Sequence, residues 1–295
     1  MAIAKGRSTE DASGFKRYIG VGNFQVLGVN PDKQTLNSWG IMTEKEPEYT
    51  DVATDKDGNE HRRARCTFYL KSVKFPDFIT SVSFFLEERH NYSKDREKIE
   101  IIDIYGNTTW ITADEAKTKR VPADISKEFR GSYVGESDLT NFIRNFLNIP
   151  SSKDYDESSR SYSLKTDAKD LENAECTLEH IKDYFNGNFS ELVEICKYQP
   201  ENQVKMLCGI KSGNDGKLRQ AVSSRYTARA YDNNAPERFK NKVNAEKAAG
   251  YLQNTEYDFN AIHEWVLKTA TPEEVEAAIE NSPFDGDDED DLPFN

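Results

Sequence analysis

The amino-acid sequence predicts a mixed α+β protein: a five-stranded, partly open barrel enlarged by helical insertions and followed by a disordered acidic C-terminal tail. Three observations carry this prediction. Short segments of alternating apolar and polar residues follow one another up to residue 112, which is typical of a small barrel or sandwich. Helix-period segments begin near residue 137. The last 14 residues have no capacity to form a core.

Length and composition bound the protein class. A chain of 295 residues with 36% hydrophobic and 31% charged residues is long for one compact domain, so we expect one domain with insertions. No stretch approaches the ~20 apolar residues that span a bilayer, and no apolar run near the start suits a signal peptide. The four cysteines are widely spaced, unlike a secreted disulfide framework. We therefore expect a cytoplasmic protein.

Negative charge is concentrated at one end of the chain. Residues 1–150 contain 22 Lys and Arg against 23 Asp and Glu, whereas residues 151–295 contain 17 against 29. Six of the acidic residues fall within 285–291. A nearly neutral body with an acidic tail remains compatible with nucleic-acid binding, although the net charge is −13.

The first elements in order are an arm, a strand, a helix and a loop. Residues 1–17 are small and polar and predict a mobile arm. Residues 18–30 alternate apolar residues with glycines, which predicts a bent first strand. Residues 33–39 predict one short helix. Residues 43–60 are charged and predict a loop, with Asp57-Gly58 as a hairpin tip.

Residues 61–75 form the most informative predicted strand. Its alternation places Ala64, Cys66, Phe68 and Leu70 on one face. The opposite face carries Arg63, Arg65, Thr67, Tyr69 and Lys71. Further strands are expected over residues 78–88, 98–105 and 108–112.

Helices and a hairpin are expected in the second half. A helix capped at Ser137-Asp138 runs to residue 148, with Leu139, Phe142, Ile143 and Phe146 on one stripe. Residues 151–175 predict a mobile linker, and helical patterns cover 178–185 and 189–196. Strands over 203–211 and 217–231 are joined by a Gly-rich hairpin turn.

The C-terminal region predicts helices and then the tail. Residues 236–249 look helical and basic, and residues 258–281 predict one or two further helices, the second starting at Pro272. We therefore divide the chain into an arm (1–17), a barrel domain (18–281) with an insertion around 135–200, and a tail (282–295).

Basic residues interleaved with aromatic residues form the candidate binding surface. Such a face suits a groove in which phosphates meet cations while bases stack on rings. Positions 217, 219, 225 and 229 share one face of an ideal strand and line up four cations. The alternative is an ordinary solvated sheet face. The candidates are Arg63, Arg65, Tyr69, Lys71, Lys94, Arg96, Trp110, Lys217, Arg219, Arg225, Tyr226 and Arg229.

The C-terminal tail places an apolar tip after an acidic run. Such a tip can insert its Phe into an apolar pocket while a basic rim binds the carboxylates. The same anionic segment can compete with DNA for the protein's own basic groove. The predicted partner-binding residues are Asp287, Asp288, Glu289, Asp290, Asp291, Leu292, Pro293 and Phe294.

The C-terminal tail and several segments of the body resemble a known family. The ending DDEDDLPFN is similar to the C-terminal tip of bacterial and phage single-stranded DNA-binding proteins, with Asn295 as an extra residue. The body resembles a family of such proteins from tailed, crAss-like phages of Bacteroidales, over residues 15–31, 102–117, 133–150 and 204–217. The resemblance implies an OB-like barrel with insertions, sequence-tolerant binding of single-stranded DNA, and a role in phage DNA replication or recombination. We further expect the tail to bind replication and recombination proteins, a role that extends to DNA repair, and a location in the host cytoplasm if the chain is phage-encoded. Self-association stays an open alternative.

Other functions are compatible with some of the same features. A virion structural or assembly protein, or a mediator that anneals complementary strands, fits the same features. Cys176, His180, Cys196 and Cys208 offer zinc ligands, but no Cys-x-x-Cys pair supports a metal site. Phosphate-binding GxxxxGK[ST], HExxH and GxSxG motifs are missing from the sequence. We therefore expect neither an enzyme nor a cofactor.

Overall fold

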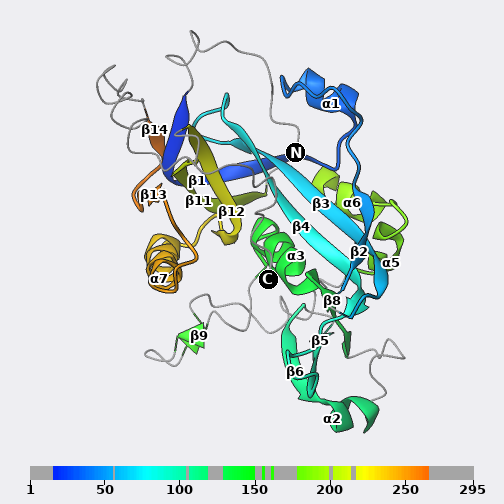
Figure 1. Cartoon of the computed structure of the whole chain (residues 1–295). Coiled ribbons are helices and arrows are strands. Elements are labelled where there is room, and N and C mark those ends of the chain that lie inside the picture. Colours follow the sequence, from blue (N-terminus) through cyan, green and yellow to red (C-terminus); the bar gives the residue numbers. More distant parts are fainter. Residues whose placement is uncertain are drawn as a thin grey trace, which may run out of the picture.

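A computed structural model describes residues 16–55, 57–103, 106–118, 129–149, 155–156, 161–162, 178–198, 202–213 and 217–265. The described part is an α+β structure dominated by antiparallel strands, with a few short helices (Figure 1). This confirms the predicted class. The expected arm up to residue 15, most of the linker and the whole tail lie outside the described residues.

Strand β1 (Arg17–Val29) joins the two halves of the main sheet. Its first half pairs with β11 (Gln203–Ser212) and its second half with β3 (Glu60–Ser72). Gly20 in this strand has φ +117°, and it leaves room for the segment before β14, since a Cβ there would lie 2.8 Å from the Cα of Ile262. A bulge at Leu27 bends the strand further. The predicted bent first strand is therefore confirmed.

The main sheet curls into a half-barrel. Its order is β12-β11-β1-β3-β4-β8, and all of these neighbours are antiparallel. The far strand β12 also contacts β4, so the sheet turns back on itself (Figure 1). The remaining bounds of this path are β4 (Ile79–His90), β8 (Tyr133–Val134) and β12 (Leu218–Arg229).

The main core fills the concave side of this sheet. Ala64, Cys66, Phe68 and Leu70 on β3 are at most 1% exposed, which confirms the predicted inward face. Helix α3 (Glu136–Phe146) adds its predicted stripe of Leu139, Phe142, Ile143 and Phe146 to the same core. Shorter helices α5 (Ile181–Tyr184) and α6 (Ser190–Tyr198) pack beside them.

The predicted cap of α3 is wrong. The helix begins at Glu136, and its N-cap is Gly135, with φ +82° and no side-chain hydrogen bond. A Cβ at Gly135 would lie 1.9 Å from the carbonyl oxygen of Phe85. The close approach of β4 therefore selects glycine here in place of a capping side chain.

A second, smaller core lies on the outer side of β11 and β12. Helix α7 (Ala235–Ala248) buries Phe239 and Val243 against Leu207 and Tyr226. Next, β13 (Thr255–Tyr257) pairs with β11, and β14 (His263–Trp265) pairs with β1. The predicted α7 is confirmed. The prediction of a helix from residue 258 is wrong as far as Trp265, because residues 263–265 pair with the edge of β1 as strand β14. Residues 266–281 lie outside the described part.

A three-stranded sheet forms a separate layer at the end of the molecule away from α1 (Lys33–Ser38), as Figure 1 shows. Buried polar residues connect it to the half-barrel. Arg130 forms a buried ion pair with Glu136, and Ser132 Oγ donates to Glu100 Oε2 at 2.7 Å. Its order is β6-β5-β7, formed by β5 (Lys98–Asp103), β6 (Thr108–Thr112) and β7 (Phe129–Gly131), with helix α2 (Ala113–Thr118) following β6.

The loop predicted over residues 43–60 is partly wrong. Its second half forms β2 (Thr50–Thr54), which pairs with β3. The short strand is mostly exposed and polar, so its sequence lacks an alternation that would indicate a strand. The predicted hairpin tip is confirmed, with Gly58 at φ +82° in the turn. Two-residue strands β9 (Tyr155–Asp156) and β10 (Ser161–Tyr162) pair within the expected linker.

Candidate nucleic-acid interface

The outer face of β3 brings together four of the predicted residues. Arg63, Arg65, Tyr69 and Lys71 alternate with the buried residues and are all partly exposed. Across the ladder on β4 they face Glu87, Phe85, Ser81 and Ile79. The face therefore combines cations and an aromatic ring, with the acidic Glu87 at the Arg63 end. Cations beside stacking rings are the combination found in sites that bind single-stranded nucleic acids.

Aromatic residues from the β1–β3 connection extend this face. The Tyr69 ring lies 5.8 Å from the Trp39 ring, centre to centre, and both are partly exposed. Trp39 follows α1 and covers the β1 bulge, where a Cβ at Gly28 would lie 2.9 Å from the Trp39 ring. The Arg65 guanidinium lies 5.5 Å from the ring centre of Tyr49. Sequence reasoning missed Trp39 and Tyr49.

The tyrosine hydroxyls on this face stay neutral at physiological pH. Burial raises the pKa of Tyr69 above its ordinary value, and the same cause raises the pKa of Tyr49. The Tyr49 hydroxyl donates to the Pro31 carbonyl oxygen at 2.8 Å, which fixes its ring against the β1–β3 connection. These rings therefore add no negative charge beside a phosphate.

Positive charge is uneven along β3. Arg63 donates to both carboxylate oxygens of Asp51 on β2, at 2.8 and 2.5 Å, and also lies 5.5 Å from the centre of the Phe85 ring. The Arg63 hydrogen bonds lower the pKa of Asp51. In contrast, Lys71 has no ion pair within the part of the chain that the structure describes. The available charge therefore lies toward the Arg65–Lys71 end.

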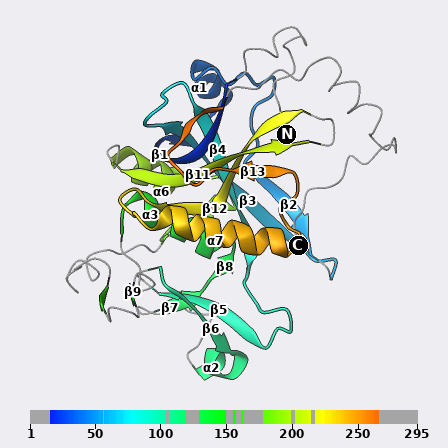
Figure 2. The same ribbon diagram turned by 90° about the vertical axis from the view of Figure 1, so that its left-hand side faces the viewer.

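The β11–β12 hairpin carries a second cationic group. Lys211 and Arg219 are directly opposite each other on its two strands, and the Lys217 carbonyl oxygen accepts from the Gly213 N–H at 2.9 Å in the turn. Lys211 and Arg219 are exposed. The hairpin and α1 lie in the same upper part of the molecule in Figure 2.

The predicted row of four cations on β12 is wrong. The ladder pairs Val222 with Cys208 but Thr227 with Met206, so the register shifts by three residues. An odd shift reverses the alternation. Arg229, opposite Val204, therefore lies on the other face of the sheet from Arg219, opposite Lys211. Arg225 is exposed within the irregular segment between these two ladders.

Tyr226 is not available as a stacking ring. It is 1% exposed, and its ring lies 5.6 Å from that of Tyr257 and 6.4 Å from that of Phe239. Its hydroxyl donates to Glu246 on α7 at 2.5 Å. Burial is the main cause that raises its pKa. Tyr226 belongs to the second core, which the period-two pattern alone did not reveal.

The other predicted residues lie apart from the β3 face. Lys94 and Arg96 are in the β4–β5 connection, where Arg96 pairs with Asp57 at the β2–β3 turn. Trp110 is 43% exposed but belongs to β6 in the separate three-stranded sheet. Residues 287–294, the predicted partner-binding tail, lie outside the described residues.

Within the described ranges, no group of three His, Cys, Asp or Glu side chains is placed to bind a metal ion. Cys196 and Cys208 are free thiols, and burial raises the pKa of Cys196 to about 12. The described helices include none that is long and apolar enough to cross a membrane. Comparison with protein-family models, curated proteins and solved structures finds no match.

Proposed function

We propose that this chain binds single-stranded DNA without sequence preference, along the outer face of β3 and β4. The observation that carries the proposal is the cluster of Trp39, Tyr49, Tyr69, Arg65 and Lys71. The partly exposed rings of Trp39 and Tyr69 beside two cations allow bases to stack while phosphates are neutralised, and Tyr49, which packs against Phe189, supports Arg65 from below.

The strand order supports an OB-type barrel as the framework of this face. Strands β11-β1-β3-β4 follow the spatial order of a Greek key, in which the fourth strand returns by a long connection beside the first. Strand β12 then contacts β4 and narrows the opening. OB barrels bind oligonucleotides on the face of their second and third strands and on two adjoining loops. Here those positions correspond to β3, β4, the α1 region and the β11–β12 hairpin.

Ion pairs within the protein limit the affinity of this face for DNA. Arg63 is engaged by Asp51, so DNA must exchange one anionic partner for another at that position. Lys71 and the hairpin lysine Lys211 have no ion pair among the described residues, and Arg65 donates to the Glu48 carbonyl oxygen and not to a carboxylate, so these three cations are better placed to gain from a phosphate. We propose that DNA follows these residues, and that Trp110, Lys94 and Arg96 lie outside the bound path.

A titration of labelled oligo-dT by fluorescence anisotropy, across a salt series, tests the proposal. Tyr69→Ala should weaken binding by about 5- to 150-fold, since one stacked base contributes ~1–3 kcal/mol, whereas Tyr69→Phe keeps the ring and most of the affinity. Lys71→Ala should lower the slope of log K against log salt by about 0.7, the value for one phosphate contact of a single strand. Lys117→Ala, an exposed lysine on α2, is the matched control and should change neither.

The possible outcomes separate the proposal from its alternatives. No salt-dependent binding at low salt would refute it and favour a structural or assembly protein. Binding together with faster annealing of complementary strands would favour an annealing mediator.

The acidic tail and the phage context belong to the same proposal. Residues 287–294 would recruit replication or recombination proteins and compete with DNA for the cationic face, because the tail is anionic and ends in Leu-Pro-Phe. In the same titration, a chain ending at Ser282 should bind oligo-dT more tightly than the full chain. Equal affinities would refute the competition but leave the DNA-binding face intact.

A further inference from the structure

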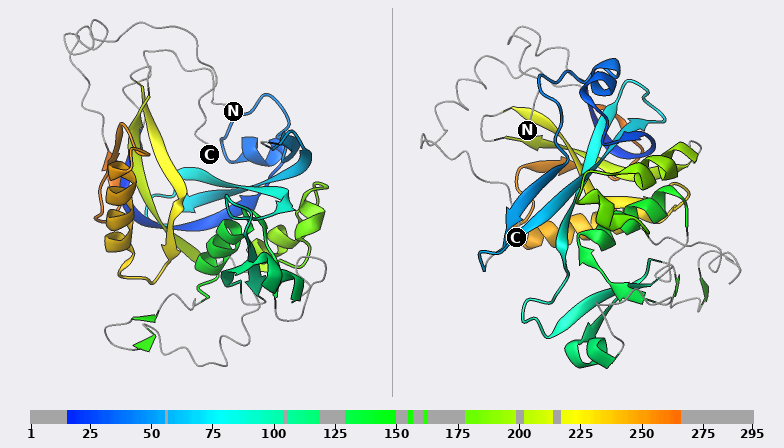
Figure 3. Two further views of the ribbon diagram at one scale, coloured as in Figure 1. Left: turned by 60° about the horizontal axis from the view of Figure 1, so that its bottom comes forward. Right: turned by 90° about the vertical axis from the view of Figure 1, so that its right-hand side faces the viewer.

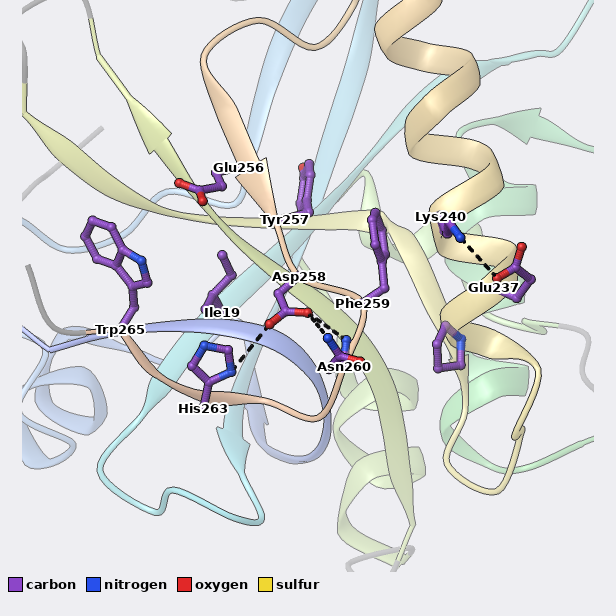
Figure 4. Close-up of a pocket in the computed structure, with 11 residues that line it drawn as sticks. Ile19, Glu237, Lys240, Glu256, Tyr257, Asp258, Phe259, Asn260, His263 and Trp265 are labelled. Carbon is purple, nitrogen blue, oxygen red and sulfur yellow. Dashed lines mark hydrogen bonds and ion pairs between the residues drawn. The ribbon is translucent and has the colours of Figure 1, made fainter.

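A pocket of about 570 Å³ lies on a different side of the molecule from the β3 face. It lies where β1 separates from β11, between α7 and the segment that forms β13 and β14 (Figure 4). In the left view of Figure 3, α7 lies on one side of the β11–β12 hairpin and β3, β4 and α1 on the other. The pocket is therefore separate from the surface proposed to bind DNA.

Aromatic rings form the apolar walls of this pocket. Tyr257, Phe259 and Trp265 line it, and all three are partly exposed. Tyr257 and Phe259 also pack against the second core, and the Tyr257 ring lies 5.6 Å from the ring of Tyr226, centre to centre. These two rings are therefore held in place before any ligand arrives. The face of an aromatic ring attracts a cation and also packs against methylene groups.

The polar lining of the pocket is mainly acidic. Glu237, Glu256 and Asp258 line it, whereas Lys240 is its only lysine or arginine. Lys240 lies 3.8 Å from Glu237, so part of its charge is already balanced. Glu256 is exposed and has no ion pair among the residues that the structure describes. A lining with this excess of negative charge repels phosphates and attracts cations.

The carboxylates are spread along the pocket. Asp258 Oδ1 accepts from the Asn260 N–H at 3.0 Å and from Asn260 Nδ2 at 2.6 Å, and these neutral donors fix its orientation without balancing its charge. In the view of Figure 4, Glu256 and Glu237 lie on opposite sides of the pocket, with Asp258 between them. Within the described ranges, no three side chains of His, Cys, Asp or Glu are placed to bind a metal ion. A compact ion therefore cannot contact the three carboxylates together, whereas an extended ligand can.

We propose that this pocket binds a linear aliphatic polyamine. Such a molecule carries several ammonium groups separated by methylene chains. The ammonium groups pair with Glu237, Asp258 and Glu256, while the methylene groups pack on Phe259 and Trp265. The volume of the pocket lies within the range of small-molecule sites, which is roughly 300–1,000 Å³. This binding does not depend on the proposed binding of DNA.

Isothermal titration calorimetry of the full chain with spermidine, at fixed ionic strength and without DNA, tests the site. Glu237→Gln with Glu256→Gln should weaken binding by roughly tenfold or more, because two charge-assisted hydrogen bonds lose their charge. Glu97→Gln with Glu194→Gln is the matched control, since it removes two carboxylates outside the pocket, and it should leave binding unchanged. Equal losses in the two double variants would overturn the proposal, because the attraction would then be diffuse.

Other cations and a ring variant provide a second measurement. Butylamine, which has a single ammonium group, and Mg²⁺, which is compact, should each bind roughly tenfold or more weakly than spermidine. Trp265→Leu should weaken spermidine binding by about 2- to 30-fold, because it removes an aromatic face. Mg²⁺ binding as tight as that of spermidine would overturn the proposal. A tri-arginine peptide with blocked ends that binds more tightly than spermidine would also overturn it, and would favour a basic segment of a partner protein.

Discussion

Replacing Glu136 by glutamine tests the buried connection between the three-stranded sheet and the barrel. Glu136 is the first residue of α3 and is 0% exposed, and the Arg130 side chain on β7 is 10% exposed. Arg130 Nη1 donates to Glu136 Oε2 at 2.8 Å, and its Nη2 donates to Oε1. The Tyr133 N–H donates to Oε2 at 2.9 Å. The carboxylate therefore satisfies three donors at once.

The expected loss of stability follows from the positive charge that remains on Arg130. Glutamine keeps one acceptor oxygen but leaves the Arg130 guanidinium buried without a counter-charge. Removing one partner of a buried ion pair costs about 3–5 kcal/mol. Since the glutamine oxygen retains one hydrogen bond, we expect the lower end of this range, about 3 kcal/mol. For a chain of this size that corresponds to a fall in Tm of roughly 6–12 °C.

Thermal unfolding followed by circular dichroism measures the effect. Glu194→Gln is the matched control, because it breaks the exposed Lys197–Glu194 pair and should change stability by no more than about 0.5 kcal/mol. The double variant Arg130→Met with Glu136→Leu removes both charges and should recover most of the loss. A Tm for Glu136→Gln equal to that of Glu194→Gln would refute the reasoning, since the pair would then be solvated.

Two further predictions concern a glycine and an ion pair. Gly135→Ala should destabilise the chain by several kcal/mol or prevent its accumulation, because the new Cβ meets the Phe85 carbonyl; Gly250→Ala, at a similar φ of +79° in open space, should cost only about 1–2 kcal/mol in a urea titration. The Arg63 hydrogen bonds keep the pKa of Asp51 below its ordinary value, so its stabilising effect is present above that ordinary value and is lost as the pH falls through the lowered one. Asp51→Asn should therefore lower stability at pH 7 by no more than about 1 kcal/mol and reduce the loss between pH 7 and pH 3; unchanged urea midpoints at both pH values would contradict this.

Local periodicity was sufficient for the elements that contact the core along their whole length. On β3, every second residue from Ala64 to Leu70 is buried as predicted, and on α3 the apolar stripe is buried as predicted. Burial of one face imposes the period of the element on its own sequence. The positions of Arg63, Arg65, Tyr69 and Lys71 on one exposed face could therefore be predicted from the sequence.

The prediction of a second cationic row on β12 is wrong because the register of this strand shifts part-way along it. The three-residue register shift in β12 sends Arg229 and Arg219 to opposite faces, and Tyr226 is drawn into a core that exists only because α7 covers the sheet. Strand β14 could not be predicted either, because it depends on a contact with a distant part of the chain. Its three residues pair with β1 only because Gly20 and Gly22 allow the segment to approach.

The sequence by itself determined the class of the fold, the inward faces of β3 and α3, and the acidic run of the tail, because these depend on spacing within short segments. Only the tertiary structure decided which cations remain available and which rings accompany them. Arg63 is neutralised by Asp51 from the neighbouring strand, and Trp39, the residue after α1, reaches Tyr69 from 30 residues away in the chain. The physical reason is that ion pairs and ring contacts depend on distance in space, which the closure of the sheet sets and no local pattern records.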